Sequence, residues 1–177
     1  MSRLLCGTAL ALLLALPAQA DIVVDLGVNP TSGTGAFSNT DPGTGGGGSG
    51  AFADIYEFDL FGTQVITIAS VTNTFASLDQ FIANFTGSVI NEGADAAPGG
   101  GDDIVVIGPV AATPCSVPNC QEFAGTAILP GGEYYLLLTG IAGVNAGYGG
   151  NLSTFAVPGP EVGGLGSLVK LVAGLLH

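Results

Sequence analysis

The stretch FADIYEFDLFGTQVITIASV, residues 52–71, determines the fold class. In residues 56–60, two aromatic residues and a leucine alternate with Glu57 and Asp59. A period of two places the apolar side chains on one face of a β-strand and the carboxylates on the other. Residues 65–71 are apolar at nearly every position and rich in β-branched side chains, which is typical of a strand covered on both faces. The Phe-Gly pair between these segments predicts a tight turn that pairs the two strands, and the apolar face of the pair requires a second layer.

Further apolar segments at roughly 8–15-residue spacing predict more strands, with no helical period between them. They lie at residues 21–28, 80–90, 104–110, 122–129, 133–139 and 152–157. The total of about eight strands predicts an all-β fold, a single antiparallel β-sandwich of jelly-roll-like or immunoglobulin-like type. We assign this domain to residues 21–157. Within it, residues 29–50 end in TGGGGSG and predict a flexible Gly-rich loop.

The charge distribution limits the classes of partner that this domain can bind. The chain has 177 residues, with 14 acidic residues and a formal net charge of −12. Its two cations, Arg3 and Lys170, lie near the ends, so the domain between them contains no Lys or Arg. Nucleic acid is excluded as a partner, because binding its phosphates requires cationic side chains. An acidic surface instead favours solubility and divalent cations.

Residues 1–20, MSRLLCGTALALLLALPAQA, have the pattern of a secretory signal peptide. Arg3 supplies the positive start, residues 4–16 form an apolar helix, and Ala-Gln-Ala is a small-x-small cleavage signal. We expect cleavage between Ala20 and Asp21, and therefore a secreted protein. The alternative is a buried or anchoring helix.

Residues 158–177 differ in kind from the domain. Pro158, Gly159 and Pro160 break the last strand, and the apolar run that follows predicts a short helix. The run is shorter than the approximately 20 residues that a membrane span needs. Lys170 interrupts it, and no Arg cluster precedes His177.

This tail, VPGPEVGGLGSLV, resembles the C-terminal sorting signal of PEP-CTERM proteins in a degenerate or truncated form. The resemblance rests on Pro158, Gly159, Pro160, Glu161 and Gly163. It implies a Gram-negative bacterium, an exosortase-type sorting protease as partner, and transient association of the tail with the inner membrane. It also implies delivery to the cell surface or to the extracellular polymer, with extracellular polysaccharide as a further partner.

The body resembles two families. Phe52 and Asp54 are similar to the start of the FxDxA-type PEP-CTERM pattern, although Tyr56 stands at the position of its Ala. The D-x-Y-x-F-x-L strand that begins at Asp54, with the later L-x-x-G-x-Y-Y-L strand of residues 129–136, resembles bacterial pre-peptidase C-terminal β-sandwich domains. These are mainly core positions, so the resemblance implies a fold and no activity.

Cys115 and Cys120 are the cysteines that remain after signal removal. An exported domain lies in an oxidising compartment, and the four-residue spacer permits bonding distance. We expect a disulfide that closes a small loop and stabilises the fold by ~2 kcal/mol. The alternative is a metal site, which would need additional Cys or His ligands.

The acidic loop NEGADAAPGGGDD is the strongest candidate for chemistry. Its carboxylates and flexible backbone suit Ca²⁺, a hard cation, although the spacing matches no EF-hand. The alternative is a solvated loop on an acidic protein. The candidate ligands are Glu92, Asp95, Asp102 and Asp103. Three other acidic residues, Asp54, Glu57 and Asp59, are alternative ligands, but we assign them to the solvent-exposed face of a strand.

No catalytic constellation stands out. The domain contains no His and no Lys, which excludes Ser-His-Asp and Cys-His arrangements. We therefore expect a non-enzymatic, exported surface or matrix protein that needs no cofactor apart from a potential Ca²⁺. Two alternatives remain open: a Ca²⁺- or glycan-binding module, and a small hydrolase that uses a carboxylate pair.

Overall fold

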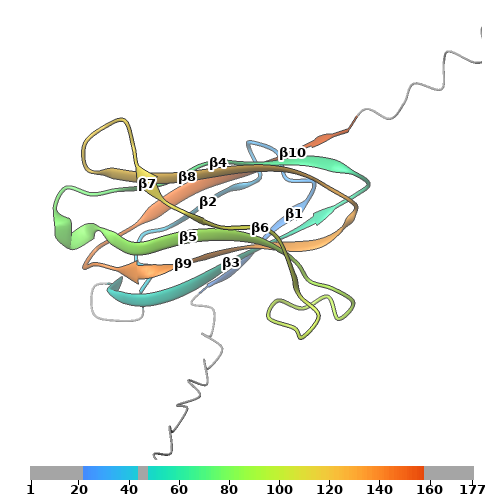
Figure 1. Ribbon diagram of the computed structural model, residues 1–177, viewed down its shortest axis with the longest axis horizontal. Helices are drawn as coiled ribbons and strands as arrows, with labels where there is room; N and C mark the ends of the chain where they lie inside the picture. Colours follow the sequence, from blue (N-terminus) through green and yellow to red (C-terminus); the bar gives the residue numbers. More distant parts are fainter. Residues whose placement is uncertain (1–21, 44–47, 158–177) are drawn as a thin grey trace, which may run out of the picture.

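Strands dominate residues 22–43 and 48–157, the part of the chain that the computed structural model describes. They form two sheets that pack face to face as a β-sandwich (Figure 1). This confirms the expected architecture at the level of an all-β sandwich. The signal segment, its cleavage site at Ala20 and Asp21, the sorting motif, and both expected flanking helices lie outside the described residues. Within the described residues, no helix has the length and apolar character needed to cross a bilayer.

The first sheet, sheet A, has five strands. Its edges are the first strand of the chain and the strand that follows the acidic loop, and its centre is a late strand. In spatial order the strands are β1 (Val23–Val28), β3 (Gly50–Leu60), β9 (Gly132–Ala142), β5 (Ile82–Asn91) and β6 (Ile104–Ala111).

The second sheet, sheet B, also has five strands. In spatial order the strands are β2 (Ala36–Asn39), β10 (Tyr148–Ala156), β4 (Gln64–Thr74), β8 (Cys120–Leu129) and β7 (Thr113–Pro114). Strand β7 is an edge strand of only two residues. A short 3₁₀ helix, η2 (Leu78–Gln80), connects β4 of this sheet to β5 of sheet A.

The expected pairing of the two strands in residues 52–71 is wrong. β3 pairs with β1 and β9, whereas β4 pairs with β10 and β8 in the other sheet. Residues 61–63 therefore carry the chain from one layer to the other, with Gly62 in the left-handed region at φ +72°. The inner side chains of β3 and β4, such as Phe58 and Ile66, both belong to the core between the sheets. Facing across the core lets both strands bury these side chains, which a flat hairpin would leave on one surface.

The segment expected to be a Gly-rich loop contains a strand, and the sandwich is not wholly antiparallel. β2 pairs with β10, and its Phe37 is buried against Tyr56 at a ring-centroid distance of 4.5 Å. The edge strand β1 runs parallel to β3, with Val23 opposite Ile55. Backbone pairing with β10 and the buried ring of Phe37 both hold this four-residue strand, whose composition is that of a loop. With β2 and β7, the described strands number ten.

The disulfide expected between Cys115 and Cys120 is present, with a Cα–Cα distance of 5.2 Å. It closes the loop between β7 and β8, where the Cys115 N–H also donates to the Cys120 carbonyl at 3.0 Å. The bond therefore stabilises a tight turn at the edge of sheet B.

A hydrogen-bonded cluster crosses the core between the sheets. The Tyr148 hydroxyl of β10 donates to Oδ2 of Asp54 on β3, and the Asn39 amide of β2 donates to the same oxygen at 2.9 Å. The Tyr56 and Tyr148 hydroxyls lie 2.9 Å apart. Burial raises the pKa of Tyr56 to about 12 and raises that of Tyr148 still further. Both hydroxyls therefore stay protonated and act as neutral hydrogen-bonding groups.

The placement of Asp54 corrects the expectation that it lies on the exposed face. Its exposed fraction is 0 %, and it shares the inward face of β3 with Tyr56 and Phe58. The period of two already indicates this, because Asp54 has the same parity as those aromatic residues and the opposite parity to Glu57. A buried carboxylate is tolerated because hydroxyl and amide donors surround it.

We predict that Tyr148→Phe lowers the free energy of unfolding by about 2 kcal/mol, because it removes the hydroxyl that donates to a buried carboxylate. Urea denaturation followed by circular dichroism measures the change. The matched control is Tyr134→Phe, whose hydroxyl donates to the Pro130 carbonyl at 3.0 Å and also interacts with the Asn91 side chain, and we expect it to cost about 1 kcal/mol or less. Equal losses in the two variants would contradict a special role for the cluster.

Candidate functional site

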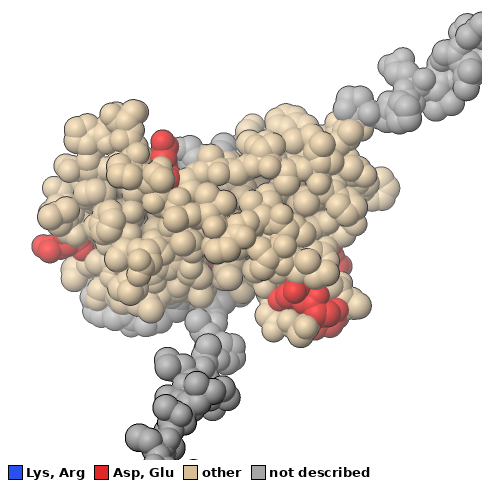
Figure 2. Space-filling model, in the orientation of Figure 1, with Lys and Arg blue, Asp and Glu red and all other residues tan. Residues whose placement is uncertain are grey.

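The candidate site is the loop between β5 and β6, which carries a group of carboxylates. Asp95, Asp102 and Asp103 each place one carboxylate oxygen within 4.8 Å of the other two. The sequence therefore identified three residues that the structure brings together. Figure 2 shows the acidic patch over this loop, on a face that is otherwise largely uncharged.

The backbone of the loop holds these carboxylates in place. The Ala94 N–H donates to Oδ2 of Asp102 at 2.5 Å. This hydrogen bond is the largest cause that lowers the pKa of the Asp102 carboxyl. Gly93, at φ +72°, and Gly100 give the chain room to turn, and a Cβ on Gly100 would clash with the Asp95 carboxylate. The glycines of the loop therefore have a physical role in bringing the carboxylates together.

Asp103 connects the loop to sheet A. Its Oδ2 accepts hydrogen bonds from the Tyr135 hydroxyl at 2.7 Å and from the Gly99 N–H at 2.8 Å. Its Oδ1 is buried and has no hydrogen-bond partner within residues 22–43 and 48–157. Burial, followed by the bond to Asp103, raises the pKa of Tyr135, so this hydroxyl remains a donor at neutral pH.

Glu92, the fourth expected ligand, is not part of the converging group. It follows the last residue of β5, and its N–H donates to the Glu133 carbonyl of β9 at 3.1 Å. Its exposed fraction is only 5 %. Burial, followed by repulsion from Glu57, Glu133, Asp103 and Asp59, raises its pKa to about 7.

Two residues of this region were not predicted from the sequence to belong to the site. Glu133 lies on the outer face of sheet A directly opposite Asp59, and Tyr135 lies on the same face two residues later. Glu57 and Asp59 are on this outer face as expected, with Asp59 exposed and Glu57 half-buried. Only the register between β3 and β9 identifies Glu133 as a neighbour of these carboxylates, and a single sequence does not contain that register.

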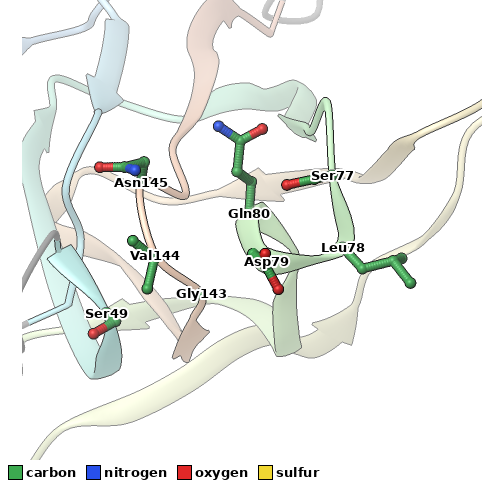
Figure 3. Close-up of a pocket in the computed structure, with 8 residues that line it drawn as sticks. All are labelled: Ser49, Ser77, Leu78, Asp79, Gln80, Gly143, Val144 and Asn145. Carbon is green, nitrogen blue, oxygen red and sulfur yellow. The ribbon is translucent and has the colours of Figure 1, made fainter.

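A surface depression at the opposite end of the sandwich offers different chemistry. It measures about 550 Å³ and lies between η2 and the turn that connects β9 to β10 (Figure 3). Asp79 is its charged residue, and Leu78 points away from it. Its other lining residues are Ser49, Ser77, Gln80, Gly143, Val144 and Asn145. A single carboxylate without a second titratable group forms no acid–base pair, so this depression does not suggest catalysis.

The side chains that the described residues offer limit the reactions that they can support. Residues 22–43 and 48–157 contain no Lys, Arg or His, and Cys115 and Cys120 are bonded to each other. Carboxylates, hydroxyls and amides remain, and these are ligands for hard cations.

No known family model matches this chain. No curated protein matches it. A similar solved structure is the pre-peptidase C-terminal domain of a collagenase from Bacillus anthracis, with 17 % identity and a TM-score of 0.38. The similarity covers 75 % of this chain and 94 % of that domain. A likeness of this extent does not transfer a function.

We predict that Glu92→Gln stabilises the protein at pH 8 by on the order of 2 kcal/mol. Because the folded-state pKa of Glu92 is raised from 4.5 to about 7, its contribution to stability is fully present below pH 4.5. The contribution is lost as the pH rises through 7. The glutamine mimics the protonated acid and removes this loss.

Urea denaturation at pH 4 and pH 8, in the presence of a chelator, measures the effect. The control is Asp79→Asn, which lies at the opposite end of the sandwich, and we expect a change within about 0.5 kcal/mol. If Glu92→Gln is no more stable than the wild type at pH 8, the carboxylate of Glu92 is not strained in the folded state.

Proposed function

We propose that this chain is an exported, non-enzymatic β-sandwich protein of the cell surface or the extracellular polymer matrix. The observation that carries the proposal is the Cys115–Cys120 disulfide. Disulfides persist in oxidising compartments outside the cytoplasm, and residues 1–20 have the pattern of a signal peptide. The strong negative charge supports solubility and keeps copies apart in such a compartment.

The destination is proposed from the tail, with an exosortase-type protease as the sorting partner and extracellular polysaccharide as the environment. Pairing of the last strand with β4 ends at Ala156, and the N–H of Val157 donates to the Thr63 carbonyl at 3.3 Å. The motif that starts at Pro158 therefore follows directly after the body. Removal of the tail at this motif would leave the strands of the sandwich intact.

The intact mass of the protein in medium, surface and cell fractions tests this proposal. We expect a mature chain that starts at Asp21 and ends near Pro160, because cleavage at both signals leaves only the body. The matched variant Pro158→Ala/Pro160→Ala should be exported normally and retain its C-terminal segment. Recovery of the protein inside the cell with residues 1–20 still attached would refute export, and full retention of His177 in all fractions would refute sorting.

A second candidate function is Ca²⁺ binding by the loop between β5 and β6. The convergence of Asp95, Asp102 and Asp103 specifically favours it, because oxygen ligands that lie close together repel one another until a cation neutralises them. The Oδ1 atom of Asp103, buried and without a hydrogen bond, supports the same conclusion.

We predict that Ca²⁺ at a hundredfold excess over its Kd raises the midpoint of thermal unfolding by roughly 8 °C, because a ligand that binds only the folded state stabilises it by about 2.7 kcal/mol. Differential scanning fluorimetry with CaCl₂, and with NaCl at equal ionic strength, measures the shift. Asp95→Asn should reduce it strongly. A shift that is equal with both salts would indicate screening of the charge and no specific site.

A further inference from the structure

A row of carboxylates crosses the outer face of sheet A beside the acidic loop. Asp59 of β3 lies directly opposite Glu133 of β9. The N–H of Glu92, which follows β5, donates to the carbonyl of Glu133. Three neighbouring chain segments, about 4.8 Å apart, thus present one acidic residue each at the same level.

The negative charge of this row is not compensated by side chains of the described residues, which contain no Lys or Arg. Like charges directly opposite each other on neighbouring strands are destabilising. Glu57 adds to the charge, because it precedes Asp59 by two residues and lies on the same face. The sequence thus keeps several repelling carboxylates at one place in the sheet.

Glu92 gives the row a feature that surface carboxylates lack. It is 95 % buried, since its exposed fraction is 5 %, and no hydrogen bond or ion pair within the described residues involves its carboxylate. The backbone hydrogen bond to Glu133 places Glu92 beside that residue, and repulsion from Glu57, Glu133, Asp103 and Asp59 agrees with this placement. A carboxylate on a largely buried side chain loses part of its hydration, and a bound cation would offset this cost.

We propose a second Ca²⁺-binding position on the outer face of sheet A, held by Glu92, Glu133 and Asp59. Asp103 of the loop group is close enough to Glu92 to repel its carboxylate, and its Oδ1 is buried with no hydrogen-bond partner among the described residues. The inference deepens the Ca²⁺-binding function proposed for the loop and does not depend on sorting.

The two positions differ in how far they are formed before a cation arrives. The loop oxygens of Asp95, Asp102 and Asp103 already converge, whereas those of the row do not form such a group. Asp59 and Glu133 are exposed, so their side chains can turn toward the fixed carboxylate of Glu92. This adjustment costs side-chain entropy, and the row therefore binds more weakly than the loop.

Luminescence of Tb³⁺, used in place of Ca²⁺, tests the proposal on the full chain. Tyr135 contacts Asp103 and lies near Glu92, so it can transfer excitation to an ion at either position. We expect two binding phases for the wild type, both reversed by excess Ca²⁺. Glu133→Gln should weaken the lower-affinity phase at least tenfold and leave the other unchanged. Asp95→Asn should weaken the higher-affinity phase, and Asp79→Asn should change neither.

The variants separate this inference from the loop proposal. A single phase that responds to Asp95→Asn and not to Glu133→Gln overturns the second position and leaves the loop site standing. A single phase that responds to Glu133→Gln and not to Asp95→Asn overturns the loop site instead, and supports the row. If Ca²⁺ does not displace Tb³⁺ from the wild type, both proposals fail. Circular dichroism of each variant confirms that the sandwich is folded, and Glu133 is exposed, so its substitution should not disturb the core.

Discussion

The carboxylate of Asp54 is buried between the two sheets, and the neutral donors that hold it come from the opposite sheet. Tyr148 of β10 and Asn39 of β2 both donate to it, while Asp54 itself belongs to β3. These hydrogen bonds therefore constrain the position of sheet A relative to sheet B. It also orients the rings around it, since Tyr148 stacks on Phe52 at 5.8 Å. A core made only of apolar side chains would leave more freedom for one layer to slide over the other.

The absence of cationic side chains between Arg3 and Lys170 constrains the whole domain. Carboxylates inside the sandwich are accommodated by hydroxyl and amide groups, and those of the loop by backbone N–H groups. No hydrogen bond from the described residues reaches the carboxylate of Glu92 on the outer face of sheet A, and neutralisation by an external cation has a physical benefit there. Without Lys or Arg, the buried carboxylate of Asp54 depends on neutral donors, whereas the carboxylates on the outer face of sheet A remain uncompensated.

Much of the architecture follows from local patterns in the sequence. Alternation in residues 56–60 identifies the inner face of β3, and the spacing of Cys115 and Cys120 identifies their bond. The pairing partners of each strand cannot be predicted from these patterns. Two strands that are consecutive in the sequence show the same alternation whether they form a hairpin or lie in opposite sheets across the core. The strand around Phe37 was not predicted for a related reason: its composition is that of a loop, and its pairing with β10 and the burial of its ring are contacts with distant residues.

The candidate site was predictable only where its residues lie close together in the chain. Asp95, Asp102 and Asp103 share one loop, and glycines between them indicate that the chain can turn back on itself. Glu133 and Asp59 become neighbours through strand pairing over a long sequence separation, which no local pattern reveals. The burial of Asp54, in contrast, was predictable from the sequence, because Asp54 alternates in phase with the inward-facing aromatic residues of β3. Its charge led to the wrong prediction of exposure.

The strand order also determines when this chain can fold. β3 reaches β5 only through β9, and β2 reaches β4 only through β10, so both sheets are completed by the last two strands. A polypeptide that emerges N-terminus first from a ribosome or a narrow channel cannot finish sheet A until β9 ends at Ala142, and cannot finish sheet B until β10 ends at Ala156. The complete sandwich therefore forms only at the end of synthesis or translocation, and the chain remains unfolded and competent for translocation until then.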